Sequence, residues 1–309
     1  MIFCLGTTPA VQRVMVFRKL TPNAVNRALA VADGPAGKSV NVAKVLKALG
    51  EEPLAAGFLG GERGRCLRDM LEAKGIETDF VTVAAQTRLC VTVIDQEAGT
   101  QTELVEEGPP VSPGDYEQLG DVLRRRVKAC RAVVMSGSLA AGGPVDLYFQ
   151  AARQAREAGV LCAVDAQGAP LAEALKAHPG LVKPNRAELA ATLGRQLKDE
   201  AGVMSAMREL GRRGAQRVVV TAGNEAVLAF DGRSFWRIIP PPVKVVNPIG
   251  CGDAFTAALL WRMLRGEALG EACRWAAAAG SANAITLMPG EVERTDVERL
   301  AAAVAVERL

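Results

Sequence analysis

The feature that most constrains the fold is the alternation of short apolar runs with longer helical stretches in the second half of the chain. Runs typical of buried strands occur at 132–135 and 161–164, and helical stretches follow them at 145–157 and 170–177. Strands separated by helices pair in parallel, and the helices cover both faces of the resulting sheet. The sequence therefore predicts an α/β fold with a mostly parallel central sheet and helices on both faces.

The first third of the chain departs from this alternation. Strand-like pieces at 14–17 and 28–31 are not separated by a helix, and the runs LCVTVID and TQTELVEE are typical of a β-hairpin. We expect a small separate sheet, built from about 10–33 and 86–106, that acts as a lid. The prediction is a single domain of 309 residues that includes these lid strands.

Composition excludes several classes of function. The net charge is only +3, so neither a nucleic-acid partner nor a membrane surface is indicated, and no apolar run has membrane-spanning length. Seven cysteines without a CxxC pair argue against a disulfide framework, and no signal peptide is recognisable, so we expect a cytoplasmic protein. His178 is the single histidine, which makes a Ser–His–Asp triad or a histidine-based metal site improbable.

The stretch NPIGCGDAFTAALLWRM, residues 247–263, joins a glycine-rich turn to an apolar helix. The backbone N–H groups of Gly250, Cys251 and Gly252 would face one point at the positive end of the helix dipole, which suits a phosphoryl group. Asp253 would then remove the proton from an attacking hydroxyl. An ordinary turn with Asp253 as a helix cap is the alternative. The helix N-terminus would also lower the pKa of the Cys251 thiol, unless Cys251 merely fills a small slot.

A second glycine-rich turn, GPAGKSVNVA, begins at residue 34 and leads into an amphipathic helix. It nearly matches the P-loop pattern GxxxxGK[ST], but Ala32 stands where the first glycine is needed. The run LCAVD, which ends at Asp165, resembles the acidic strand end of a P-loop enzyme. A P-loop NTPase is therefore one alternative.

Polar residues also follow two further strands. VKPNRAEL carries Lys183, Asn185 and Glu188 after a short apolar strand, and VVVTAG ends a buried strand with Thr221 and Gly223. Ligands of open α/β sheets bind at the carboxyl ends of the strands. Both segments are therefore candidates for a binding site.

Three of these motifs together resemble the PfkB (ribokinase-like) carbohydrate kinases. GPAGKSVNVA is similar to the family signature GGKGxNxA, NPIGCGDAF to (D/N)xxGAGDxF, and KPNRAE to KPNxxE. Their order and spacing fit over the whole chain. The NP start of the second signature, TRLCVTVID with GTQTELVEEGPPVS, and SGSL at 136–139 resemble the 1-phosphofructokinase and tagatose-6-phosphate kinase branch.

The resemblance implies a ribokinase-like fold and ATP-dependent phosphorylation of a hydroxyl, most directly on a phosphorylated ketohexose, with ATP and Mg²⁺ as cofactors. The roles it implies fall into four groups: catalysis by Asp253 with Gly250, Cys251 and Gly252; substrate binding by Gln12, Lys38, Asn41, Arg88 and Ser138; ATP binding by Lys183, Asn185, Thr221, Gly223 and Asn283; and Mg²⁺ binding, mainly through water, by Asn185 and Glu188. It also suggests a homodimer through the lid sheet.

The departures from the family pattern collect where the sugar would bind. Thr8 stands in place of an Asn, and Gln12 in place of an Asp that holds sugar hydroxyls. Ala36 and Ser39 replace two glycines, and Ala140 replaces a Pro. These changes leave the acceptor open. A kinase of an unphosphorylated sugar or nucleoside, and a sugar-phosphate-binding protein without turnover, are the alternatives.

Overall fold

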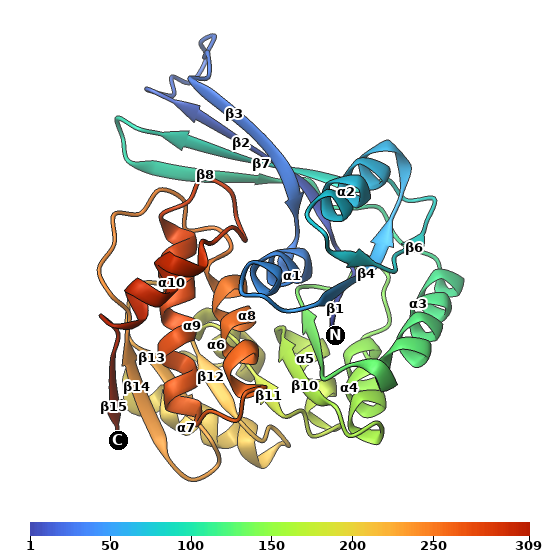
Figure 1. Cartoon of the computed structure of the whole chain (residues 1–309), viewed down its shortest axis with the longest axis vertical. Coiled ribbons are helices and arrows are strands. Elements are labelled where there is room, and N and C mark those ends of the chain that lie inside the picture. The colour runs from blue at the N-terminus through green and yellow to red at the C-terminus, as the bar shows by residue number, and fades with distance from the viewer.

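The main sheet runs through the whole body of the protein in the computed structural model, which describes residues 1–309 (Figure 1). Its strands, in spatial order, are β15 (Ala305–Arg308), β14 (Phe235–Ile239), β13 (Val227–Phe230), β12 (Val218–Val220), β11 (Leu181–Val182), β10 (Leu161–Asp165), β9 (Ala132–Ser136), β1 (Ile2–Gly6), β4 (Pro53–Leu59) and β5 (Glu77–Thr78), and β6 (Val81–Thr82) pairs with β4. All neighbours from β12 to β5 are parallel, and only the edge strands β13, β14 and β15 pair antiparallel.

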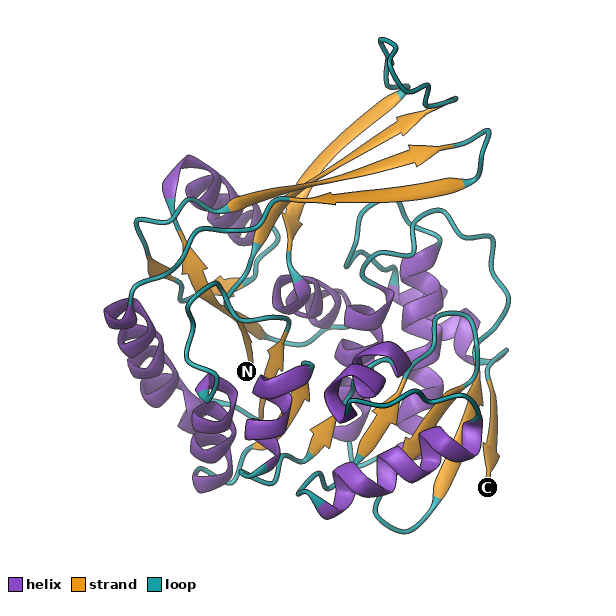
Figure 2. Ribbon diagram, turned by 180° about the vertical axis from the view of Figure 1, so that it is seen from behind, coloured by secondary structure: helices purple, strands orange, loops and turns teal.

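Helices cover both faces of this sheet, which confirms the predicted fold class (Figures 1 and 2). One face packs against α1 (Lys38–Ala48), α2 (Gly61–Ala73), α8 (Cys251–Met263), α9 (Leu269–Ala284) and α10 (Arg294–Ala301). The other face packs against α3 (Pro113–Arg126), α4 (Leu147–Glu157), α5 (Gly168–Leu175), α6 (Arg186–Leu193) and α7 (Glu200–Arg212). The central strands β1, β4, β9, β11 and β12 are buried along their whole length, as a parallel sheet between two helix layers requires. None of the helices combines the length and the apolarity that crossing a bilayer demands.

Four strands form the small sheet, in the order β3 (Ala30–Ala36), β2 (Ala10–Phe17), β7 (Arg88–Asp95) and β8 (Thr100–Val105). It projects from one end of the body (Figure 1). Its inner face packs on the body, where Met288 joins Val14, Val16 and Ile94 in a separate apolar cluster.

One strand of the small sheet extends beyond the expected bounds. Strand β2 begins at Ala10, as expected, but β3 continues past residue 33, through Gly34 and Pro35, to Ala36, where it pairs with β2. The expected glycine turn is thus reduced to Gly37, and helix α1 begins at Lys38. Edge strand β15 and helices α6 and α7 were not among the predicted elements.

The P-loop alternative is wrong. A P-loop follows a strand of the central sheet, whereas the strand that precedes Lys38 is β3 of the small sheet. Lys38, which resembled a P-loop lysine, is therefore positioned by the small sheet and not by a strand of the central sheet.

Candidate active site

The turn before helix α8 requires a glycine at its last position. Gly250 has φ 86°, and a Cβ atom there would lie 2.8 Å from the backbone N of Gly290 and 2.9 Å from Cβ of Pro289. A side chain would therefore be strained and would also clash with the segment beneath the turn. This close packing fixes where the helix begins.

The N–H groups of this turn are not all equally free. Cys251 N–H donates to the carbonyl of Pro248 over 3.3 Å, a long bond, whereas Gly250, Gly252 and Asp253 have no backbone acceptor. Free N–H groups at a helix N-terminus attract an anion. A Cβ atom on Gly252 would lie 3.8 Å from Nζ of Lys183, so an ammonium group adjoins the same spot.

Asp253 is buried beside this spot, with only 6% of its surface exposed. Asn41, on the first turns of α1, donates from Nδ2 to Oδ2 of Asp253 over 2.7 Å. Burial raises the pKa of Asp253 to about 7, and the nearby Asp165 also raises it, whereas Lys38, the Asn41 hydrogen bond and Lys183 act in the opposite direction. This carboxyl group can gain and lose a proton near neutral pH.

Asp165, at the end of β10, links the positive groups of the site. It is 2% exposed, and its Oδ2 lies 3.1 Å from Nζ of Lys183 and accepts a hydrogen bond from Thr256 over 3.0 Å. Its Oδ1 lies 3.8 Å from Nζ of Lys38 and has no hydrogen-bond partner. In the sequence, Asp165 was a candidate only under the P-loop alternative. An acidic residue that ends a buried parallel strand was the signal that could have identified it.

Lys38 reaches across the site from the start of α1. Its Nζ forms a 3.0 Å ion pair with Glu188, and its stem lies next to Gly137, where a Cβ atom would be 3.6 Å from Cβ of Lys38. Burial alone would lower the pKa of Lys38, but Asp165, Glu188 and Asp253 together raise it above its ordinary value. Lys38 therefore stays charged and connects the Gly137–Ser138 turn with the carboxylates.

Asn185 and Glu188 form a capping box at the start of α6. Asn185 Oδ1 accepts from the backbone N–H of Glu188, and Glu188 Oε2 accepts from the backbone N–H of Asn185, both over 2.8 Å. The same helix start is joined to β12, because the N–H of Arg186 donates to the carbonyl of Thr221. Asn185, Thr221 and Gly223 line one open groove beside this helix.

Asn283, which the family resemblance assigns to ATP binding, is 1% exposed and holds two backbone segments together. Its Nδ2 donates to the carbonyl of Ile249 over 2.8 Å, and its Oδ1 accepts from the N–H of Gly290 over 2.7 Å. Asn283 thus fixes the glycine-rich turn of residues 247–252 to the segment below it. Both polar atoms of its amide bond to the backbone.

The expectation of a lowered pKa for Cys251 is wrong. Burial raises the pKa of this thiol to about 11, although Asn283 Nδ2, 3.5 Å from the sulfur, favours the thiolate. At this position the loss of water outweighs the helix dipole. Cys251 is therefore a small, protonated side chain in a packed slot.

The small sheet and the body meet around Gln12 and Arg88. Gln12 is 2% exposed and donates from Nε2 to Oγ1 of Thr92 over 2.8 Å, which leaves its carbonyl oxygen without a protein partner. Arg88 donates to the carbonyl of Thr8 over 3.0 Å, and its buried Nε has no partner. Ser138 lies on an exposed turn, and its carbonyl accepts a hydrogen bond from Thr7.

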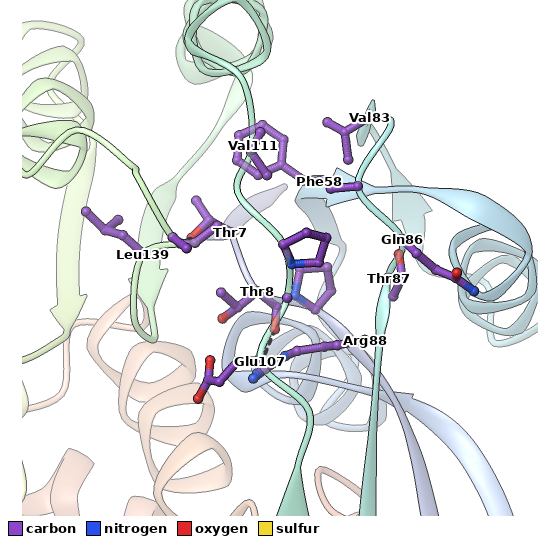
Figure 3. Close-up of a pocket in the computed structure, with 16 residues that line it drawn as sticks. Thr7, Thr8, Phe58, Val83, Gln86, Thr87, Arg88, Glu107, Val111 and Leu139 are labelled. Atoms are coloured by element: carbon purple, nitrogen blue, oxygen red, sulfur yellow. Dashed lines mark hydrogen bonds between the residues drawn. The ribbon is translucent and has the colours of Figure 1, made fainter.

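A pocket opens beside Arg88 (Figure 3). Arg88 and Glu107 lie toward one end, and Phe58, Val83 and Val111 line the other. Thr8 and Ala140, two of the positions that depart from the family pattern, also line this pocket.

No three acidic, cysteine or histidine side chains are arranged to hold a metal ion directly. Asp165, at the end of β10, and Glu188, in the first turn of α6, nevertheless offer carboxylate oxygens, and Oδ1 of Asp165 is buried without a partner. Mg²⁺ takes few protein ligands and keeps several waters when it binds with phosphates. The residues present fit a Mg²⁺ ion that is held mainly through water.

The three signature segments therefore meet at one site, with Asn41, Asp165 and Asp253 at its centre. The sequence matches the pfkB family carbohydrate kinase model over residues 1–287. The chain belongs to the pfkB family of carbohydrate kinases. It is accordingly a phosphotransferase.

The relatives and solved structures that the chain resembles include a kinase named for a sugar phosphate and a kinase complexed with one. The chain is 30% identical over 295 residues to the tagatose-6-phosphate kinase of Staphylococcus epidermidis, covering 94% of each protein. Two structures of Escherichia coli phosphofructokinase-2, a tetrameric inhibited form and a complex with fructose-6-phosphate, each match with a TM-score of 0.88 at 29% identity, covering 97% of this chain and 98% of that one. Arabidopsis thaliana ribokinase, complexed with ribose and ATP, shares the fold with a TM-score of 0.75 at 21% identity over 97% of each chain.

Proposed function

We propose that this pfkB-family protein transfers the γ-phosphoryl group of ATP to a hydroxyl of a phosphorylated ketohexose. The observation that carries the proposal is the placement of Asp253. Its carboxyl group, with a pKa of about 7, lies buried at the N-terminus of α8 and is held there by Asn41. A general base is most effective when its pKa lies near the working pH.

Asp253 removes the proton of the acceptor hydroxyl as that oxygen attacks the γ-phosphorus. The bond from phosphorus to the leaving oxygen of ADP breaks in the same displacement. Negative charge that develops on the phosphoryl oxygens is met by the free N–H groups of Gly250 and Gly252 and by the ammonium of Lys183, which adjoins Gly252. Catalysis of phosphoryl transfer consists mainly of such positioning and charge stabilisation.

The nucleotide lies, in this proposal, along the groove lined by Asn185, Thr221 and Gly223. Mg²⁺, when bound, would supply charge neutralisation at the phosphates, and Glu188 and Asp165 would hold it through water. Asn185 fixes the Glu188 carboxylate by the capping box and so sets its direction.

The phosphate of the acceptor binds near Lys38, Arg88 and Ser138. Lysine and arginine side chains neutralise a phosphate, and the unpartnered Nε of Arg88 leaves a donor available for one. Gln12 replaces the acidic residue of related kinases and carries no charge. A neutral hydrogen bond contributes roughly 0.5–1.5 kcal/mol, against about 1.5–3 kcal/mol for one to a charged group. We therefore expect a best acceptor that differs from fructose 1-phosphate and tagatose 6-phosphate.

A coupled assay of ATP consumption over a panel of phosphosugars, free sugars and nucleosides tests this proposal. One phosphorylated sugar should give the highest kcat/KM, and Gln12→Asp should raise kcat/KM on fructose 1-phosphate by on the order of tenfold while lowering it on the best acceptor. A preference for an unphosphorylated sugar or a nucleoside would refute the acceptor class. Absence of turnover with every acceptor would refute the kinase itself.

A further inference from the structure

Lys44 is a buried lysine that the proposed mechanism does not use. On α1, Lys38, Asn41 and Lys44 follow one another at intervals of three residues. Their side chains therefore lie along one side of the helix. Lys44 is 5% exposed and forms no ion pair. Its hydrogen-bond partners are two backbone carbonyls, that of Pro35 over 3.1 Å and that of Pro289 over 2.7 Å.

A buried ammonium group without a carboxylate partner is expensive to keep. Burial lowers the pKa of Lys44 to about 8, against the attraction of the more distant Glu291 and Asp253; the charge of Lys74 lowers it further. A leucine or methionine would fill the same space without this cost. The presence of a lysine in this buried position therefore points to a task for its two hydrogen bonds.

The two carbonyls belong to segments with different neighbours. Pro35 lies in β3, the strand that joins the small sheet to Gly37 and Lys38. Pro289 lies in the segment Met288–Gly290. This segment packs directly against the glycine-rich turn of residues 247–252, which is the catalytic turn of the proposed mechanism. A Cβ atom on Gly250 would come within 2.9 Å of Pro289, and Asn283 bonds both Gly290 and Ile249.

A second contact joins the same two segments. The side chain of Met288 packs with Val14, Val16 and Ile94 of the small sheet. A Cβ atom on Gly34 would lie 2.8 Å from Cε of Met288. The segment Met288–Gly290 thus touches the small sheet on one side and the catalytic turn on the other.

We propose that Lys44 is a positioning residue for phosphoryl transfer: its ammonium group ties the end of strand β3 to the Met288–Gly290 segment, so that the small sheet and the catalytic turn keep one fixed relation. This role rests on the proposed kinase function. A small displacement of the catalytic turn would misplace the reacting groups and so lower turnover. Lys44 touches neither the acceptor nor the nucleotide, so its loss affects kcat more than either KM.

The test compares three variants: Lys44→Met, Lys44→Arg and, as the control, Lys47→Met. Lys47 is an exposed lysine of the same helix. In folded protein well below its melting temperature, Lys44→Met should lower kcat by roughly tenfold to a hundredfold, the range expected from misplacement by about 1 Å. Lys44→Arg, which can still donate to both carbonyls, should recover most of this loss. Lys47→Met should match the wild type.

Hydrogen–deuterium exchange measures the tie itself, without any turnover. In Lys44→Met, exchange should rise in peptides covering both 30–37 and 286–291, and in Lys47→Met in neither. A failure of the kinase proposal would appear as an inactive wild type, separately from this exchange result. Unchanged exchange in either segment, or kcat within about twofold of wild type in folded Lys44→Met, overturns the role of Lys44. If Lys44→Met does not fold, Lys44→Gln, whose shorter side chain cannot bond both carbonyls, replaces it with the same expected and contradicting results.

Discussion

Asp253 has a pKa of about 7, far above the ordinary aspartate value of 3.8, because folding removes its carboxyl group from water. Below pH 3.8 the group is protonated in both the folded and the unfolded chain, and its contribution to stability is complete. As pH rises from 3.8 to 7, the unfolded chain releases the proton first, so this contribution is progressively lost. The protein is therefore less stable at the pH at which this proposed base is ionised.

Asp253→Asn removes this dependence on pH. Between pH 5 and pH 8, the free energy of unfolding of the wild type should fall relative to that of Asp253→Asn by about 2–3 kcal/mol, since one pKa unit corresponds to about 1.4 kcal/mol. Denaturant unfolding at the two pH values measures the difference. Asp69→Asn, an exposed site on α2, is the control and should parallel the wild type. Parallel behaviour of Asp253→Asn would contradict the raised pKa.

Some properties of single residues could not be predicted from the sequence, because they depend on burial in the folded protein. Asp253 and Asn41 were identifiable from their motifs, and they are in contact. The pKa of Cys251 was expected to fall because a helix N-terminus is visible in sequence, but the burial that raises it is not. For Asn283, the two backbone partners lie in segments that only the folded chain brings together.

At the scale of elements, the two glycines of the catalytic turn have different tasks. Gly250 has a positive φ and no room for a side chain, whereas a Cβ atom on Gly252 would meet only Nζ of Lys183, at an ordinary 3.8 Å. Gly250 is thus required by the fold. Gly252 keeps open the space in which the transferred phosphoryl group is proposed to bind.

Gly250→Ala and Gly252→Ala should separate these tasks. Gly250→Ala should lose about 1–3 kcal/mol of stability, the cost of a strained backbone position. Gly252→Ala should unfold like the wild type but lose turnover, because its methyl group occupies the space beside Lys183. Thermal unfolding and kcat, measured on both variants, decide the matter. Equal stability loss in the two variants would contradict this distinction.

The order of the elements was largely predictable, because alternation of apolar runs with helical stretches indicates a parallel sheet. The ends of the strands in the small sheet were harder to predict. Strand β3 extends through Gly34 and Pro35, residues that favour turns, because pairing with β2 and packing on Met288 outweigh their local preference. Helices α6 and α7 were not predicted, although Val203, Ala206, Met207 and Leu210 have the spacing of one buried helix face and Asn185 with Glu188 has the spacing of a capping box.

At the scale of the molecule, the small sheet leaves one broad face without a covering layer (Figures 1 and 2). Val31 and Leu104 are 54% and 55% exposed, and their strand partners Met15 and Val91 are half-buried. Exposed apolar side chains on a sheet are typical of an interface. The homodimer expected from the sequence remains a prediction, and this face is where we expect it.

Light scattering after size-exclusion chromatography tests the dimer. The wild type should elute as a dimer or a larger assembly, and Val31→Lys combined with Leu104→Lys should give monomers, because two charges would be buried unpaired. Val145→Lys changes an exposed valine of the main body and should leave the assembly intact. A monomeric wild type, or dimers of the double variant, would refute this interface.

The catalytic role of Asp253 is tested most directly by kcat of Asp253→Asn, measured with the best acceptor of the panel alongside binding of ATP. ATP affinity should stay within a few-fold of wild type, since Asn keeps the shape of the side chain. Turnover should fall by about 10²–10⁴, the usual contribution of a general base. Turnover above a tenth of the wild-type value would contradict the assignment of Asp253 as the base.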